Sequence, residues 1–135
     1  MEGRVPEVTE ATPFERLGGA EAVRRLVDHF YDRMELRADC APLRAMHAAD
    51  LDEARDKLTW FLTGWLGGPQ LYVERFGHPR LRARHLPFPI DTAARDQWMA
   101  CMRDALAAEV ADVELRAYLD RALAGLADHM RNQPG

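Results

Sequence analysis

The sequence predicts an all-α protein. Four segments repeat apolar residues at intervals of three and four, which is typical of amphipathic helices, and no strand-like alternation is found. One long stretch, residues 67–90, lacks this repeat and contains four prolines. A chain of 135 residues is long enough for one domain with a real core. We expect residues 1–12, which are polar and aperiodic, to form a flexible arm, and residues 13–131 to form the single domain.

Composition and charge narrow the class of protein. The net charge is −4 and the arginines are scattered among carboxylates, which argues against a nucleic-acid partner. No apolar run approaches the roughly 20 residues of a membrane span, and the first seven residues lack the apolar core of a secretory signal. Cys40 and Cys101 lack a C-x-x-C spacing, as expected for reduced thiols. These features predict a cytoplasmic protein with no membrane partner.

The first long helix is predicted after a short leading helix and a permissive turn at Leu17-Gly18-Gly19. Its apolar stripe has the spacing of one helix face and consists of Val23, Leu26, Val27, Phe30, Tyr31 and Met34. Residues 36–49 mix polar and apolar residues without a period, so we expect a loop that holds Cys40, Pro42 and His47.

The second helix is predicted to open with Asp50 and Glu53, which are spaced like a capping pair, and to end at Gly67-Gly68-Pro69. Its stripe consists of Leu51, Ala54, Leu58, Phe61, Leu62 and Trp65. A third helix is expected from about Asp91 to Ala108, with Ala94, Trp98, Met102, Ala105 and Leu106 on one face. A fourth is expected from about Asp112 to Met130, with Leu115, Leu119, Ala122, Leu123 and Leu126.

The proline-broken segment 67–90 cannot be one long helix, although Arg80 to Leu86 has room for one or two turns. A connection of this length inside a compact domain is uncommon and is often functional. It contains His85, which is flanked on both sides by apolar residues and has no competing ligand nearby. Two interpretations remain open at this point: a half-buried histidine bonded to a backbone carbonyl, or the single axial base of a haem.

Other side chains also allow two interpretations. Arg80, Arg82 and Arg84 either solvate an exposed segment, or one or two of them pair with haem propionates. Tyr31 and Trp98 either pack in the core or donate hydrogen bonds to a ligand. Among the remaining histidines, we expect His29 to be solvated, His78 to be a turn residue and His129 to lie near the helix-terminal carbonyls. The spacing does not decide the role of His47.

Taken in order, several motifs resemble the truncated haemoglobins, and among these group II. The resemblance covers roughly residues 13–131. It is carried by Leu17-Gly18-Gly19-Ala20, Phe30-Tyr31, Trp60-Phe61-Leu62, Gly67-Gly68-Pro69, Gly77-His78-Pro79-Arg80-Leu81-Arg82, Arg84-His85-Leu86-Pro87-Phe88, and Arg95-Asp96-Gln97-Trp98 with Cys101-Met102.

The resemblance implies a two-over-two helical sandwich around haem b, which is iron protoporphyrin IX. It implies that His85 is the proximal iron ligand and that Trp98 and Tyr31 are distal hydrogen-bond donors. His47 is implied as a third distal residue, with Met46 as the alternative because the preceding loop varies in length. The further residues implied to contact the haem are Ala54, Lys57, Leu58, Phe61, Tyr72, Arg84, Phe88 and Trp98, of which Lys57, Arg84 and Tyr72 meet the propionates.

A protein of this family is expected to bind dioxygen, nitric oxide, carbon monoxide or peroxide. Two distal donors predict slow oxygen release, which suits nitric oxide dioxygenation or a peroxidase-like reaction better than oxygen transport. Either reaction needs an external reductase, because the chain carries no flavin or nicotinamide motif. Homodimerisation is common in the family, although the sequence specifies no interface. A haem-based gas sensor and a haem-free helical interaction module are the alternatives.

Overall fold

The computed structural model describes residues 11–134, and this part of the chain is helical without strands. The predicted arm at residues 1–10 lies outside the described residues. The helices in chain order are α2 (Pro13–Leu17), α3 (Ala20–Leu36), the 3₁₀ turn η1 (Ala38–Cys40), α4 (Ala41–Ala45), α5 (Asp52–Trp65), α6 (Leu71–Phe76), α7 (Leu81–His85), α8 (Thr92–Glu109) and α9 (Val113–His129).

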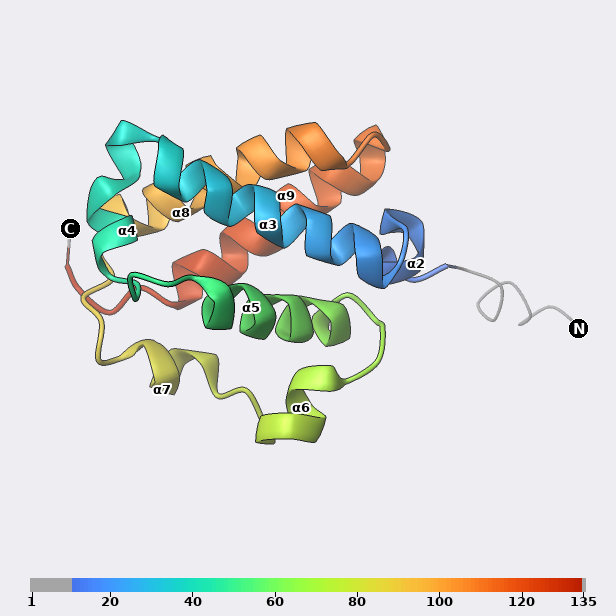
Figure 1. Cartoon of the computed structure of the whole chain (residues 1–135), viewed down its shortest axis with the longest axis horizontal. Coiled ribbons are helices and arrows are strands. Elements are labelled where there is room, and N and C mark those ends of the chain that lie inside the picture. Colours follow the sequence, from blue (N-terminus) through green and yellow to red (C-terminus); the bar gives the residue numbers. More distant parts are fainter. Residues whose placement is uncertain (1–10, 135) are drawn as a thin grey trace, which may run out of the picture.

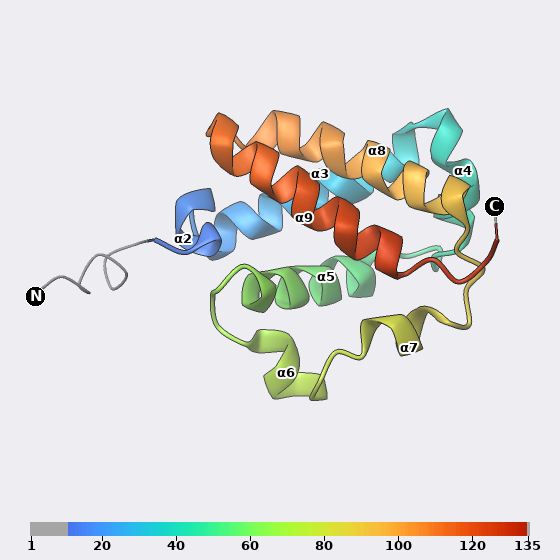
Figure 2. The same ribbon diagram turned by 180° about the vertical axis from the view of Figure 1, so that it is seen from behind.

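Four long helices form the body of the molecule. Helix α3 packs against both α5 and α8, and α8 also packs against α9 (Figure 1). Helices α6 and α7 lie beyond α5, on the side away from α3 and α8, in both views (Figures 1 and 2). The arrangement confirms the predicted all-α, two-over-two fold. No helix within residues 11–134 is both long and apolar enough to cross a membrane.

Local sequence signals explain the first turn of the fold. The Thr12 hydroxyl accepts a hydrogen bond from the Glu15 amide, and the Glu15 carboxylate accepts one from the Thr12 amide, which forms a complete capping box. Gly18 and Gly19 then adopt φ values of 122° and 85°, which side chains other than glycine rarely tolerate. The predicted short leading helix and glycine turn are therefore confirmed, and Thr12 is the residue that caps the helix.

Two sequence-based expectations about the middle of the chain are wrong. Residues 36–49 are not a simple loop, because burial of Cys40 and Leu43 stabilises η1 and α4. The capping pair at the start of α5 does not form either. The helix begins at Asp52 after the buried N-cap residue Leu51, and Asp50 accepts only the Asp52 amide. Glu53 instead binds the Lys57 ammonium group at 2.8 Å.

The core agrees with most of the predicted stripes. All six stripe residues of α3 are buried, and so are Leu115, Leu119 and Leu123 of α9. On α8 the centre of the buried face is shifted, since Met99 and Cys101 are buried while Trp98 is only half-buried. The stripe of α5 differs most, because Trp65 is 38% exposed and the side chains of Ala54, Leu58 and Phe61 are covered only in part. The apolar side of α5 that carries Ala54, Leu58, Phe61 and Trp65 is thus only partly covered by the core.

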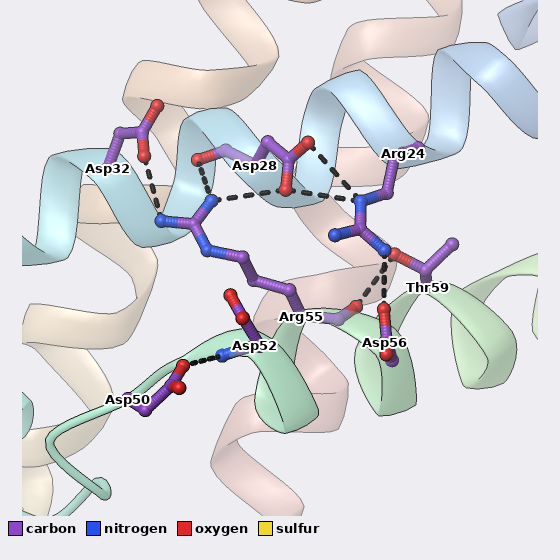
Figure 3. A network of polar contacts seen from close by, with 8 residues as sticks. All are labelled: Arg24, Asp28, Asp32, Asp50, Asp52, Arg55, Asp56 and Thr59. Atoms are coloured by element: carbon purple, nitrogen blue, oxygen red, sulfur yellow. Dashed lines mark hydrogen bonds and ion pairs between the residues drawn. The ribbon is translucent and has the colours of Figure 1, made fainter.

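A network of ion pairs fixes α5 against α3 (Figure 3). Arg55 of α5 donates to the Asp28 carbonyl at 3.1 Å and to the carboxylates of Asp28 and Asp32 at 3.1 and 2.8 Å. Arg24 of α3 binds Asp28 of its own helix at 3.2 Å and Asp56 of α5 at 2.7 Å. A single partly exposed pair contributes little alone, but together these pairs hold α5 against α3.

Candidate functional site

His85 is the last residue of α7, and one of its ring nitrogens is already engaged. Its Nδ1 lies 2.6 Å from the Leu81 carbonyl oxygen, so Nδ1 carries the proton and donates it. Nε2 then keeps its lone pair, and it has no hydrogen-bond partner among residues 11–134. The apolar neighbours Leu86 and Phe88 are 57% and 43% exposed. The imidazole is therefore a half-buried base beside apolar side chains.

Tyr31 presents a buried hydroxyl group that has no hydrogen-bond partner in the described part of the chain. Its side chain points inward from α3 and is only 6% exposed. Burial raises the pKa of Tyr31 to about 12, although the Arg55 guanidinium, 5.7 Å from the ring centre, lowers it in part. No residue from 11 to 134 makes a hydrogen bond with this hydroxyl, which is unusual because buried polar groups are nearly always paired.

Trp98 is the second donor without a partner in the described part of the chain. Its ring lies on α8 with its centre 5.0 Å from that of Phe30, and the indole N–H donates to none of these residues. Phe30 and Tyr31 are neighbours on α3, with ring centres 4.9 Å apart. The two predicted distal donors therefore flank the same buried phenylalanine.

His47 lies after α4 with its ring centre 5.9 Å from that of Tyr31. Its Nδ1 lies 3.0 Å from the Leu43 carbonyl oxygen. Burial lowers the pKa of His47, and the hydrogen bond at Leu43 opposes this effect in part. The positive charge of Arg44 also lowers it. Met46, the alternative, packs half-buried against the core.

The residues predicted to meet propionates fall into two groups. Tyr72 of α6 is buried, and the Arg84 guanidinium lies 5.7 Å from the centre of its ring. Arg84 also donates from Nε to the Pro79 carbonyl at 2.7 Å, and its terminal nitrogens make no hydrogen bond with residues 11–134. Lys57 of α5 is held by Glu53 and lies 5.5 Å from the ring centre of Phe76.

Arg82 does not join these cations. Its Nη1 donates to the His129 and Arg131 carbonyls at 3.0 and 2.8 Å, so this guanidinium holds the end of the chain. Among the remaining histidines, His29 is not simply solvated, because its Nδ1 lies 3.3 Å from the Glu109 carboxylate. His78 is a turn residue as expected, since its ring accepts the Arg80 amide at 3.1 Å.

Partly covered apolar side chains lie along one side of α5. Ala54, Leu58 and Phe61 of α5 are half-buried, and Phe61 lies against Tyr72 with ring centres 6.4 Å apart. A cavity of about 160 Å³ lies between α5 and α6. It is lined by Trp60, Phe61, Gly64, Trp65, Gln70, Tyr72, Val73 and Pro79. Sequence reasoning missed Trp65 as a lining residue, because its stripe position predicted burial in the core.

These residues fit a haem. His85 offers an unpaired nitrogen base, which is what an axial position needs. Tyr31 and Trp98 offer buried or half-buried donors whose partner is missing among residues 11–134. The half-covered apolar face of α5 and the exposed Leu86 and Phe88 suit a flat apolar ring.

Known proteins resemble this chain over nearly its whole length. A model of the bacterial-like globin family matches residues 12–132. The group 2 truncated hemoglobin YjbI of Bacillus subtilis is 45% identical over 121 residues, which is 90% of this chain and 89% of that protein. The cold-adapted truncated hemoglobin of Pseudoalteromonas haloplanktis superposes with a TM-score of 0.90 at 46% identity, over 91% of this chain and 99% of that one. The group II 2-on-2 hemoglobin of Agrobacterium tumefaciens gives a TM-score of 0.90 at 42% identity, over 93% and 97% of the two chains.

Proposed function

Since the chain belongs to the bacterial-like globin family, as a group 2 truncated haemoglobin, we propose that it binds haem b through His85 and detoxifies nitric oxide, peroxide or peroxynitrite. Membership of the family supports haem-based binding of gaseous ligands such as oxygen. The observation that supports the finer proposal is a pair of donors, Tyr31 of α3 and Trp98 of α8, which have no hydrogen-bond partner among residues 11–134 and whose rings both lie about 5 Å from that of Phe30.

The proximal side of the proposed site prepares His85 for ligation. The hydrogen bond from Nδ1 to the Leu81 carbonyl selects the tautomer whose Nε2 is a base, and it also orients the ring. A haem iron, when bound, supplies reversible binding of diatomic gases and redox chemistry. Leu86 and Phe88 provide the apolar surface on either side of the turn after His85.

The distal side supplies hydrogen bonds to a polar ligand. A neutral hydrogen bond contributes about 1 kcal/mol, which slows ligand release roughly fivefold, and the effect is larger where water is excluded. Tyr31 is protonated as a donor at physiological pH, and burial, which raises its pKa to about 12, keeps it protonated into the alkaline range. Two such donors favour long retention of the ligand, which suits chemistry on the ligand better than oxygen delivery.

The periphery of the proposed site offers charge for the two propionates. Arg84 keeps its terminal nitrogens open beside the buried ring of Tyr72, and Lys57 lies on α5 near Phe76. Ala54, Leu58 and Phe61 provide the apolar wall from α5. Each of these side chains can be substituted singly to test its proposed contact with the haem.

The proposed turnover needs electrons from outside the chain, and an external reductase is the partner we propose. The substrates are dioxygen with nitric oxide, or a peroxide, and carbon monoxide is expected to bind as an inert competitor. In the cytoplasm, where we place the protein, such a reductase has access to nicotinamide cofactors.

The first test is spectroscopic. The purified protein should show a Soret band, and His85→Ala should lose it or lose normal axial ligation. His78→Ala is the matched control, because His78 lies in the same segment and only accepts the Arg80 amide. An unchanged spectrum in His85→Ala would overturn the assignment of the ligand. Turnover of nitric oxide to nitrate, measured against peroxidase activity with a supplied reductant, then separates the two detoxification reactions.

A further inference from the structure

Helix α7, which carries His85, is not anchored by burial. None of its residues is buried, and it lies apart from the four long helices in Figures 1 and 2. The prolines at 79, 87 and 89 limit continuation of the helix at both ends. The position of His85 relative to the rest of the fold therefore has to be fixed by polar contacts.

Asn132 supplies several of these contacts at once. Its side-chain Nδ2 donates to the carbonyl oxygen of His85 at 3.2 Å and to that of Phe88 at 2.9 Å. Its Oδ1 accepts the Ile90 amide at 2.9 Å, and its own amide donates to the Ile90 carbonyl at 2.8 Å. Both hydrogens of Nδ2 and the side-chain oxygen are thus used, and the partners leave one possible orientation of the amide group.

Arg82 makes the reciprocal connection from α7. Its Nη1 donates to the carbonyl oxygens of His129 and Arg131. The segment 129–133, which we term the C-terminal segment, is thereby joined to α7 at both ends of the helix. Arg82 lies near the start of α7, and Asn132 binds the carbonyl of its last residue.

The C-terminal segment is itself attached to the helical body. Arg131 binds Asp128 at 2.8 Å and donates to the Thr92 hydroxyl at 3.0 Å. Arg95 of α8 binds the same Asp128 oxygen at 2.5 Å. Because Thr92 and Arg95 belong to the first turn of α8, these contacts run from α8 through the C-terminal segment to His85.

We propose that Asn132 and Arg82 are positioning residues that hold His85 at a defined place relative to α5 and α8, with the C-terminal segment as a brace. The inference rests on the proposed function, because the position of His85 matters through the haem that it ligates. Leu81 orients the imidazole ring from within α7, whereas Asn132 fixes the backbone of His85 from outside it. Asn132 lies one residue past the domain end expected from the sequence, and no local motif marks it.

The decisive variant is Asn132→Asp, which keeps the acceptor for the Ile90 amide and places a carboxylate oxygen against the two carbonyls. Gln133→Ala is the matched control, because the Gln133 side chain is exposed and makes no hydrogen bond with residues 11–134, while its backbone amide still binds the Ile90 carbonyl. We expect the iron–histidine stretching band of the ferrous protein to shift or broaden in Asn132→Asp. We also expect haem loss to an acceptor globin to become about tenfold faster, as for other residues that orient metal ligands.

Hydrogen exchange of the haem-free protein gives an independent measurement. Amides of residues 81–90 should exchange faster in Asn132→Asp and in Arg82→Ala, while those of α3 and α8 should keep their protection. An iron–histidine band and haem-loss rate in Asn132→Asp equal to those of Gln133→Ala would overturn the inference while leaving haem binding intact. Absence of haem binding by the unaltered chain would instead refute the proposed function.

Discussion

The sulfur atoms of Cys40 and Cys101 lie 3.3 Å apart, and the Cys40 thiol in turn lies 3.5 Å from the Gln97 carbonyl oxygen. The two thiols thus form a buried chain of hydrogen bonds that joins η1 to α8 and ends at the carbonyl of Gln97, the residue before Trp98. The sequence separation of 61 residues gave no indication of this pair.

Both thiols should be unreactive in the folded protein. Burial, and to a smaller extent the hydrogen bond with Cys40, raise the pKa of Cys101 to about 12. At pH 8 the thiolate fraction of Cys101 is then on the order of 10⁻⁴, and thiolate is the reactive form. Labelling with an aromatic disulfide reagent should be slow in buffer and rapid in guanidinium chloride. Rapid labelling of two thiols in the folded state would contradict the prediction.

Tyr31→Phe should change the alkaline stability of the haem-free protein. A pKa raised from 10 to about 12 means that the folded state holds the phenolic proton where the unfolded state has lost it. The contribution to stability is therefore fully present below pH 10 and is lost as the pH rises towards 12. The free energy of unfolding should fall between pH 9 and pH 11 in the unaltered protein. In Tyr31→Phe this decrease should be smaller by about 1 kcal/mol. Tyr118→Phe, at an exposed position on α9, should behave like the unaltered protein.

Trp98→Phe tests the distal role of the indole N–H. The substitution keeps an aromatic ring against Phe30 and removes the donor. We expect oxygen dissociation to become about fivefold faster, as for the loss of one hydrogen bond, with a melting temperature close to that of the unaltered protein. Stopped-flow replacement of oxygen by carbon monoxide measures the rate. An unchanged rate would mean that Trp98 serves only in packing.

Arg55→Ala should destabilise the contact between α3 and α5. The guanidinium is only 15% exposed and binds Asp28 and Asp32. Its loss removes the partner of Asp32 and leaves Asp28 bound to Arg24 alone, and we expect a decrease of about 1–2 kcal/mol in the free energy of unfolding. Arg103→Ala is the comparison, because the pair of Arg103 with Asp120 is largely exposed and should contribute less than about 0.5 kcal/mol. Equal losses in the two variants, measured by urea unfolding, would count against a network effect.

The long helices could be predicted because each carries one regular apolar stripe, and α3 buries all six residues of its stripe in the core. The short helices α4 and α6 could not, because five or six residues do not form a stable helix unless other parts of the fold cover them. The start of α5 differs from the predicted opening at Asp50 for a similar reason. Burial of Leu51 fixes the N-cap there, although Asp50 has the better side chain for capping.

Some residues of the candidate site could likewise be predicted from the sequence, and others could not. His85, Tyr31 and Trp98 carry recognisable chemistry and could be selected from the sequence, and the structure leaves Nε2 of His85 and the Tyr31 and Trp98 donors without partners among residues 11–134. Asn132 could not be selected, because its partners are backbone carbonyls 44 and 47 residues away. Arg82 was expected either in solvent or at the propionates, and only the folded chain shows it bound to carbonyls of the last helix and the residues after it.

Helix α5 and residues 77–90, which lie on two sides of the candidate site, differ in how firmly they are held to the core. Helix α5 is attached to the core by buried side chains and ion pairs. Residues 77–90, in contrast, have almost no buried side chains and depend on a few hydrogen bonds. Segments of this kind open at a lower free energy than the core, as separate cooperative units. Residues 77–90 can therefore unfold and refold while the remaining helices keep their structure, so that a large flat cofactor can enter or leave without global denaturation.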